Sequence, residues 1–199
     1  MQLARPASLL DSAELLHLAM AAIRDREHER AITLLKQGLE QSPDDARLLY
    51  LLGAEHAQIG LYDRAIDEIA RSVALDAGMP SAHFQLGLLH LLRGDGVAAR
   101  AAWQPLGALA EGDVFRVFVA GLIHLLEGDG AACAARIEQG MALCTANPAL
   151  GESMGRILES VRQASVQGGA GAGAVGDAAA EPADAGAARH VLLSAYTTR

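Results

Sequence analysis

Residues 46–79 read ARLLYLLGAEHAQIGLYDRAIDEIARSVALDAGM, and the chain on either side of this stretch repeats its pattern with a period of 34 residues. Four columns of residues recur at this interval: Gly53, Gly87 and Gly121; Gly60, Gly94 and Gly128; His56, His90 and His124; and Ala31, Ala65, Ala99 and Cys133. A fixed period of this kind is the signature of a repeat architecture, in which each repeat is one supersecondary unit that stacks on its neighbours.

Each repeat is predicted to contain two helices. Apolar residues recur at helical spacing between Arg47 and Ile59, and again from Tyr62 to Leu75. Gly60 separates these helices, because a positive φ is cheap only for glycine, and Pro80 opens the next repeat at a position where its missing N–H costs nothing. The same pattern predicts repeats at about residues 12–45, 46–79, 80–113 and 114–147.

Small residues and one proline carry predictions about packing. The columns that contain Gly53 and Ala31 are expected where the two helices of a hairpin cross closely, so that a larger side chain would overpack the crossing. Pro105 lies inside the second helix of the third repeat, with Gly107 nearby. Because proline removes a helical hydrogen bond, we expect this helix to be kinked or shortened.

The repeat resembles the tetratricopeptide repeat, whose pattern is a bulky residue, Leu-Gly, an aromatic residue, a small Ala, a large apolar residue and a Pro. The second repeat matches with Leu49, Leu52-Gly53, His56, Ala65 and Ile69, although a histidine stands where an aromatic residue is usual. The resemblance covers about residues 12–147. It implies an all-α fold, a right-handed α-solenoid of four helix-turn-helix hairpins, and a non-enzymatic module that binds a protein or peptide partner.

The segments outside the repeats differ from one another in character. Residues 1–11 form an N-terminal lead, which ends where Asp11 and Glu14 resemble a capping box. Residues 148–166 are predicted to form a capping helix, and the Gly/Ala-rich residues 167–188 a flexible linker. Residues 189–199 carry an apolar patch, which is either a short docking peptide or a disordered end with incidental hydrophobic residues. This patch consists of Val191, Leu192, Leu193 and Tyr196.

In tetratricopeptide arrays the first helix of each hairpin lines a concave groove, so the resemblance implies peptide-binding residues on these helices. The candidates are Tyr50, Phe84, Leu88, Leu91, Phe115, Phe118, Leu122 and Leu125, joined by Leu16, Met20 and Ala54 at equivalent positions. The first helices of the third and fourth repeats are apolar on nearly every face. Their side chains therefore either pack against neighbouring helices or form a dry trough for an apolar peptide, and we expect the phenylalanines to be its exposed anchors.

Composition and spacing argue against several classes of function. The formal net charge of −8 disfavours binding to nucleic acid, and no stretch is apolar for long enough to insert into a membrane. Equivalent histidines on successive repeats are expected roughly 10 Å apart, too far for one metal ion, so core histidines are the better interpretation. We expect no metal, no cofactor and no catalytic constellation. The two cysteines fall in helical pattern, which makes a reducing cytoplasm the default expectation.

Three functions are consistent with these features. The first is a cytoplasmic adaptor or scaffold that holds a peptide or helix of another protein in the groove. The second is a secretion or assembly chaperone for an aggregation-prone client, as some small bacterial arrays of the resembled family are. The third is a scaffold that self-associates through its C-terminal tail.

Overall fold

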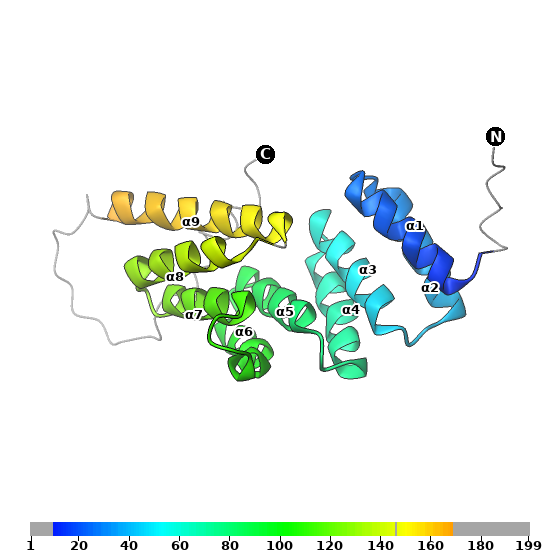
Figure 1. Cartoon of the computed structure of the whole chain (residues 1–199), viewed down its shortest axis with the longest axis horizontal. Coiled ribbons are helices and arrows are strands. Elements are labelled where there is room, and N and C mark those ends of the chain that lie inside the picture. The colour runs from blue at the N-terminus through cyan, green and yellow to red at the C-terminus, as the bar shows by residue number, and fades with distance from the viewer. Residues whose placement is uncertain (1–9, 146, 169–199) are drawn as a thin grey trace. The chain divides into compact units, whose positions relative to one another are not determined.

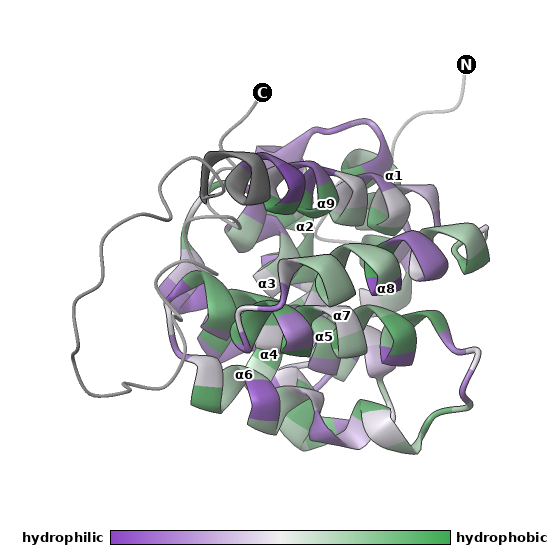
Figure 2. Cartoon of the chain, turned by 90° about the vertical axis from the view of Figure 1, so that its left-hand side faces the viewer, coloured by the Kyte–Doolittle hydropathy of each residue, from purple (hydrophilic) through white to green (hydrophobic). Residues whose placement is uncertain are grey.

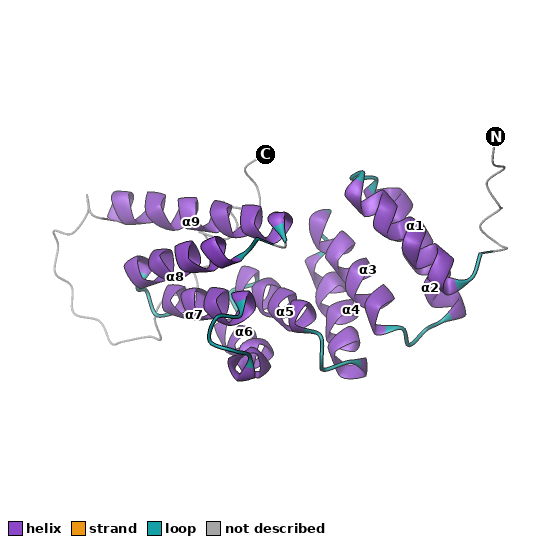
Figure 3. Cartoon of the chain, viewed as in Figure 1, coloured by secondary structure: helices purple, strands orange, loops and turns teal. Residues whose placement is uncertain are grey.

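The computed structural model describes residues 10–145 and 147–168, and this part of the chain consists of helices joined by short turns, with no strand (Figure 1, Figure 3). The all-α arrangement of helical hairpins predicted from the sequence is confirmed. The chain divides into two compact units, Met1–Leu89 and His90–Arg199, so that the boundary falls within one helix. Each unit is described by itself.

Unit 1 contains two complete hairpins and the start of a third. Its helices are α1 (Ser12–Arg24), α2 (His28–Gln41), α3 (Ala46–Gln58), α4 (Tyr62–Leu75) and most of α5 (Pro80–Leu92). The helices α1, α2 and α3 share one core because each contributes apolar residues at helical spacing to it. This core consists of Leu15, Ala19, Ala22, Ala31, Leu34, Leu35, Leu48 and Leu52.

Unit 2 contains the rest of the third hairpin, the complete fourth hairpin and the helix that follows it. After the end of α5 come α6 (Gly96–Trp103), the 3-10 helix η2 (Gln104–Ala108), α7 (Val114–Leu126), α8 (Gly130–Leu143) and α9 (Pro148–Gly168). The helix α6 has 8 residues, whereas α4 and α8 have 14 each, and Pro105 lies in η2 directly after it. The predicted shortening at Pro105 is therefore confirmed.

The period of 34 residues is visible in where the helices begin. The first helices α1, α3, α5, α7 and α9 start at Ser12, Ala46, Pro80, Val114 and Pro148. Gly60, Gly94 and Gly128 have φ values of 81°, 81° and 77°, in the left-handed region where a side chain is strained. The first hairpin places Arg26 at the equivalent turn position, with φ 59°.

The glycines inside the hairpins lie at close helix crossings, as predicted. A Cβ atom built on Gly53 would stand 2.5 Å from Ile69 Cγ1 and 3.0 Å from the Ala65 carbonyl oxygen. At Gly121 the nearest atom would be Arg136 Cβ, at 3.1 Å. Glycine therefore allows α3 to approach α4, and α7 to approach α8, more closely than any other residue would.

Acidic and amide side chains cap the helices. The predicted capping box is present, since Glu14 N–H donates to Asp11 Oδ1 at 2.8 Å and Asp11 N–H donates to Glu14 Oε2 at 3.0 Å. Leu150 N–H donates to Asn147 Oδ1 at 3.1 Å at the start of α9. That helix buries an apolar stripe that consists of Met154, Ile157, Leu158 and Val161.

Candidate functional site

The first helices of unit 1 leave a set of apolar side chains partly uncovered. Leu16, Met20 and Ile23 follow one another along α1 at i, i+4 and i+7, so they lie on the same side of the helix. Met20 is 50% exposed, whereas Leu16, Ile23 and Leu51 of α3 are half-buried and pack one side against the core. We call Leu16, Met20, Ile23, Tyr50 and Leu51 the unit 1 face.

Tyr50 adds a polar group to this face. Its side chain is half-buried, and its hydroxyl is hydrogen-bonded to Ser81 at the start of α5. Burial raises the pKa of the Tyr50 phenol above its ordinary value, and the hydrogen bond with Ser81 offsets only part of that rise. At neutral pH the group is therefore an uncharged hydroxyl beside apolar surface, a combination that is common where proteins bind peptides.

Most of the groove residues predicted on α5 and α7 are not available to a ligand. The expectation of an open apolar trough is wrong for six of them, because at most 8% of each side chain is exposed. These are Phe84, Leu88, Leu91, Phe118, Leu122 and Leu125. Most apolar side chains of α7 are buried, whereas Phe115 and His124 keep part of their surface. Figure 2 shows α7 as a largely hydrophobic helix.

Phe118 shows the physical reason for this correction. Its side chain has no exposed area, and its ring lies so close to Gly140 of α8 that a Cβ atom there would stand 2.4 Å from two ring carbons. Phe118 is therefore a core residue whose ring packs between α7 and α8 where the two helices cross. Of the predicted groove residues, Tyr50 and Phe115 keep part of their surface, and they belong to different units.

Residues of the predicted docking peptide, Val191, Leu192, Leu193 and Tyr196, lie outside the residues that the structure describes.

The histidine column is only partly a core feature. His56 is 2% exposed, and its Nδ1 atom lies 2.6 Å from Glu68 Oε2. In contrast, His90 is half-buried and the His124 side chain is 35% exposed, so the expected stack of core histidines holds at His56 alone. Among the described residues, no group of three or more His, Cys, Asp or Glu side chains could hold a metal ion.

Cys133 is held in an unreactive state. Burial against α7 raises the pKa of its thiol to about 12, and the nearby charge of Asp129 acts in the same direction. A thiol with so high a pKa is protonated at neutral pH, which deprives it of nucleophilic character.

The comparisons with known proteins concern the fold. The sequence matches no family model and no curated protein. Two solved structures described as MamA superpose on it with TM-scores of 0.56 and 0.55, at 22% and 19% sequence identity. The matches cover 66% and 78% of this chain, and 77% and 86% of those chains. The Sgt2 TPR domain from Aspergillus fumigatus covers 90% of the chain and 97% of its own length at 19% identity, with a lower TM-score of 0.40.

The chain has a tetratricopeptide-like fold. The hairpin period and the glycine crossings agree with the similarity to the MamA structures, and at these identities the likeness concerns the fold alone. No helix in the described part of this tetratricopeptide-like chain is both long and apolar enough to cross a membrane.

Two exposed residues of the tetratricopeptide-like fold were missed as candidates. Ile59 and Leu61 flank the turn glycine of the second hairpin and are 47% and 40% exposed. A comparison of the four turns at the period of 34 residues would have found them, because the other three turns carry charged residues at both positions.

Proposed function

We propose that this chain is a non-enzymatic, cytoplasmic adaptor whose unit 1 face binds a peptide or helix of another protein. The observation that carries the proposal is the half exposure of Met20 between Leu16 and Ile23, which the fold itself leaves uncovered. Methionine adapts its shape to a partner better than branched side chains do, and Tyr50 of α3 carries a hydroxyl group. Both cysteines are free, which suits a reducing compartment.

The alternative of a chaperone for aggregation-prone clients has lost its main support. It depended on an apolar surface on α5 and α7, whose leucines and phenylalanines are mostly buried. The alternative of self-association through the tail is tested by the experiment of the next subsection.

A pair of surface variants tests the adaptor proposal. The wild-type chain is used to isolate partners from its source cells, and the binding segment of a partner is then titrated as a labelled peptide. We expect Met20→Glu to weaken peptide binding by about tenfold or more, because a charge then has to be desolvated in the contact. Val97→Glu is the matched control, since Val97 is 83% exposed on α6 of unit 2.

Circular dichroism of both variants establishes that the helices persist. Equal binding by wild type and Met20→Glu would exclude the unit 1 face as the peptide site.

A further inference from the structure

The turn of the second hairpin differs from the other three turns in one respect. The residues that flank the left-handed position are charged in the other hairpins: Asp25 and Glu27, Arg93 and Asp95, and Glu127 and Asp129. In the second hairpin they are Ile59 and Leu61, whose side chains are 47% and 40% exposed. Two adjacent apolar side chains thus stand on the surface at a position that the repeat otherwise keeps charged.

Leu61 also weakens the helix that it opens. Of the three equivalent residues, Asp95 and Asp129 accept hydrogen bonds from Ala98 N–H and Ala132 N–H, at 2.8 and 2.9 Å, whereas Glu27 makes no side-chain cap. Leu61 is the N-cap residue of α4, and no side-chain hydrogen bond caps that helix. Leucine is among the poorest N-cap residues, so the fold gains nothing from its presence there. A residue such as Leu61, which disfavours the start of its own helix, indicates that this surface makes a contact.

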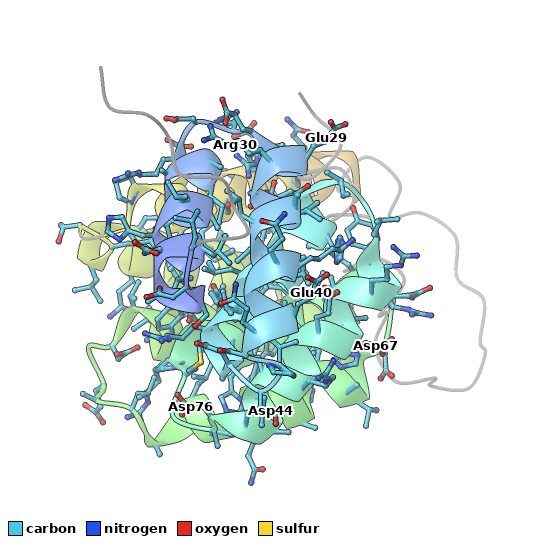
Figure 4. All side chains as sticks on the ribbon, turned by 90° about the vertical axis from the view of Figure 1, so that its right-hand side faces the viewer. Glu29, Arg30, Glu40, Asp44, Asp67 and Asp76 are labelled. Carbon is cyan, nitrogen blue, oxygen red and sulfur yellow. The ribbon has the colours of Figure 1, made fainter. Side chains whose placement is uncertain are left out.

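Acidic residues outnumber basic ones in unit 1, although α4 also carries the exposed Arg64 and Arg71. Asp63 and Asp67 follow at i, i+4 on the exposed side of α4, whereas the positions equivalent to Asp67 hold Thr33, Ala101 and Ala135. Across residues 10–89 there are thirteen Asp and Glu residues against seven Arg and Lys. Figure 4 shows exposed acidic side chains over α2, α4 and the turns that follow them, with Glu29, Glu40, Asp44, Asp67 and Asp76 labelled together with the basic Arg30. The turn therefore suits a partner that is apolar and basic.

We propose that the turn Ile59–Tyr62 docks the C-terminal segment 189–199 of the same chain. That segment has the required chemistry, because Val191, Leu192, Leu193 and Tyr196 are apolar and Arg189 and Arg199 are its only charged residues besides His190. Its apolar side chains cover Ile59 and Leu61, and its arginines face the carboxylates of α4. The proposal is independent of the unit 1 face, which lies on other residues.

A long stretch of chain lies between the described residues and the apolar patch. Residues 169–190 separate the end of α9 from the apolar patch, and a stretch of that length spans roughly 75 Å when fully extended. A Gly/Ala-rich tether of this length gives the segment at its end an effective concentration on the order of millimolar. Even when its affinity is low, the segment then binds the turn of its own chain in preference to the turn of a second copy.

Hydrogen exchange of the full chain, read by mass spectrometry, tests this docking. The test variant is Ile59→Arg combined with Leu61→Asp, which gives the second turn the residues that the third turn carries at Arg93 and Asp95. We expect amides of residues 190–197 to exchange about fivefold or more faster in this variant than in wild type. Val97→Asp is the control, because it also removes an exposed apolar side chain, and it should leave exchange unchanged.

The fold is not put at risk by the test variant, since Leu61→Asp supplies the missing cap and the melting temperature should not fall. A second variant probes the contact from the other side: Leu192→Asp combined with Leu193→Asp should speed exchange at residues 60–62. Equal tail exchange in wild type and the turn variant would overturn the proposal. Protection of the tail that grows with protein concentration would overturn it too, because the segment would then dock on a second copy.

Discussion

The ring of Phe118 occupies the space in which a side chain at position 140 would have to lie, since a Cβ atom on Gly140 would stand 2.4 Å from two of its carbons. Because Phe118 has no exposed area, its ring cannot move outward to make room. We therefore expect Gly140→Ala to lower the free energy of unfolding by about 1–3 kcal/mol through overpacking.

Urea unfolding followed by circular dichroism measures this effect. Gly151→Ala is the matched control, because nothing lies within 4 Å of a Cβ atom there and alanine favours the helix by about 0.5–1 kcal/mol. Adding Phe118→Leu to Gly140→Ala should recover part of the loss, since the smaller side chain vacates the contact. Equal stability of both glycine variants would contradict the geometry at Gly140.

The sequence predicts the hairpins well because their determinants are local. Gly60 sets the backbone of its turn, and Pro105 ends the helix before it. Asp11 caps the helix that begins at Ser12 by accepting a hydrogen bond from Glu14 N–H, three residues further on. Each of these effects can be predicted from neighbouring residues. The exposure of Phe118 is not local. Whether an apolar side chain on α7 faces a groove or Gly140 depends on which helices cover it, and hydrophobicity alone predicts both. The sequence therefore predicts which helices carry aromatic residues, but not which of these residues are exposed.

The two helix crossings differ in how tightly they are packed. A Cβ atom on Gly53 meets Ile69 Cγ1 at 2.5 Å and a carbonyl oxygen at 3.0 Å, whereas on Gly121 it meets its nearest neighbour at 3.1 Å. We expect Gly53→Ala to destabilise the chain by roughly 2–3 kcal/mol and Gly121→Ala by about 1 kcal/mol or less. Thermal unfolding of the two variants gives the order directly, and a reversed order would rule out this account of the crossings.

Glu55 is a buried side chain that is hydrogen-bonded to a residue of the neighbouring hairpin. It is 3% exposed, and His28 Nδ1 of α2 lies 2.7 Å from its Oε2 atom. Removal of the His28 ring leaves the buried Glu55 carboxyl without this hydrogen-bond partner, so His28→Ala should cost about 1–3 kcal/mol. His124 pairs with Glu127 at 3.5 Å on the surface, where His124→Ala should cost at most about 1 kcal/mol. Denaturant titration of the two variants compares them, and similar losses would show that burial of Glu55 is not decisive.

Asp45 links the stability of the second hairpin to pH. Burial would raise the pKa of its carboxyl, but hydrogen bonds from the Arg47 side chain and from the backbone N–H groups of Arg47 and Leu48 hold the pKa below 3.8. A carboxyl with a depressed pKa in the folded state contributes stability above its unfolded pKa, and this contribution is lost as the pH falls through the folded pKa. Asp45→Ala should therefore cost about 1 kcal/mol at pH 7 and progressively less below about pH 4.

Unfolding curves of wild type and Asp45→Ala at several pH values reveal this convergence. Asp45→Asn serves as the control, because its amide caps the helix without a charge, so the difference in stability between Asp45→Asn and Asp45→Ala should not vary with pH. A cost of Asp45→Ala that stayed constant down to about pH 3 would show that the charge of Asp45 plays no part.

The two cysteines should react at very different rates. Since burial raises the pKa of Cys133 to about 12, only about one molecule in ten thousand carries its thiolate at pH 8. Cys144 is half-buried, and its Sγ–H donates to the Asn147 carbonyl oxygen at 3.3 Å on the surface. With an aromatic disulfide reagent, one thiol per native chain should react quickly and the second only on unfolding, and Cys144→Ser should abolish the quick phase.

Because Cys133 lies on α8 against α7, Gly140→Ala should speed its labelling in the Cys144→Ser background, as the loosened crossing opens more often. Two thiols that reacted at the same rate in the native chain would refute the burial of Cys133.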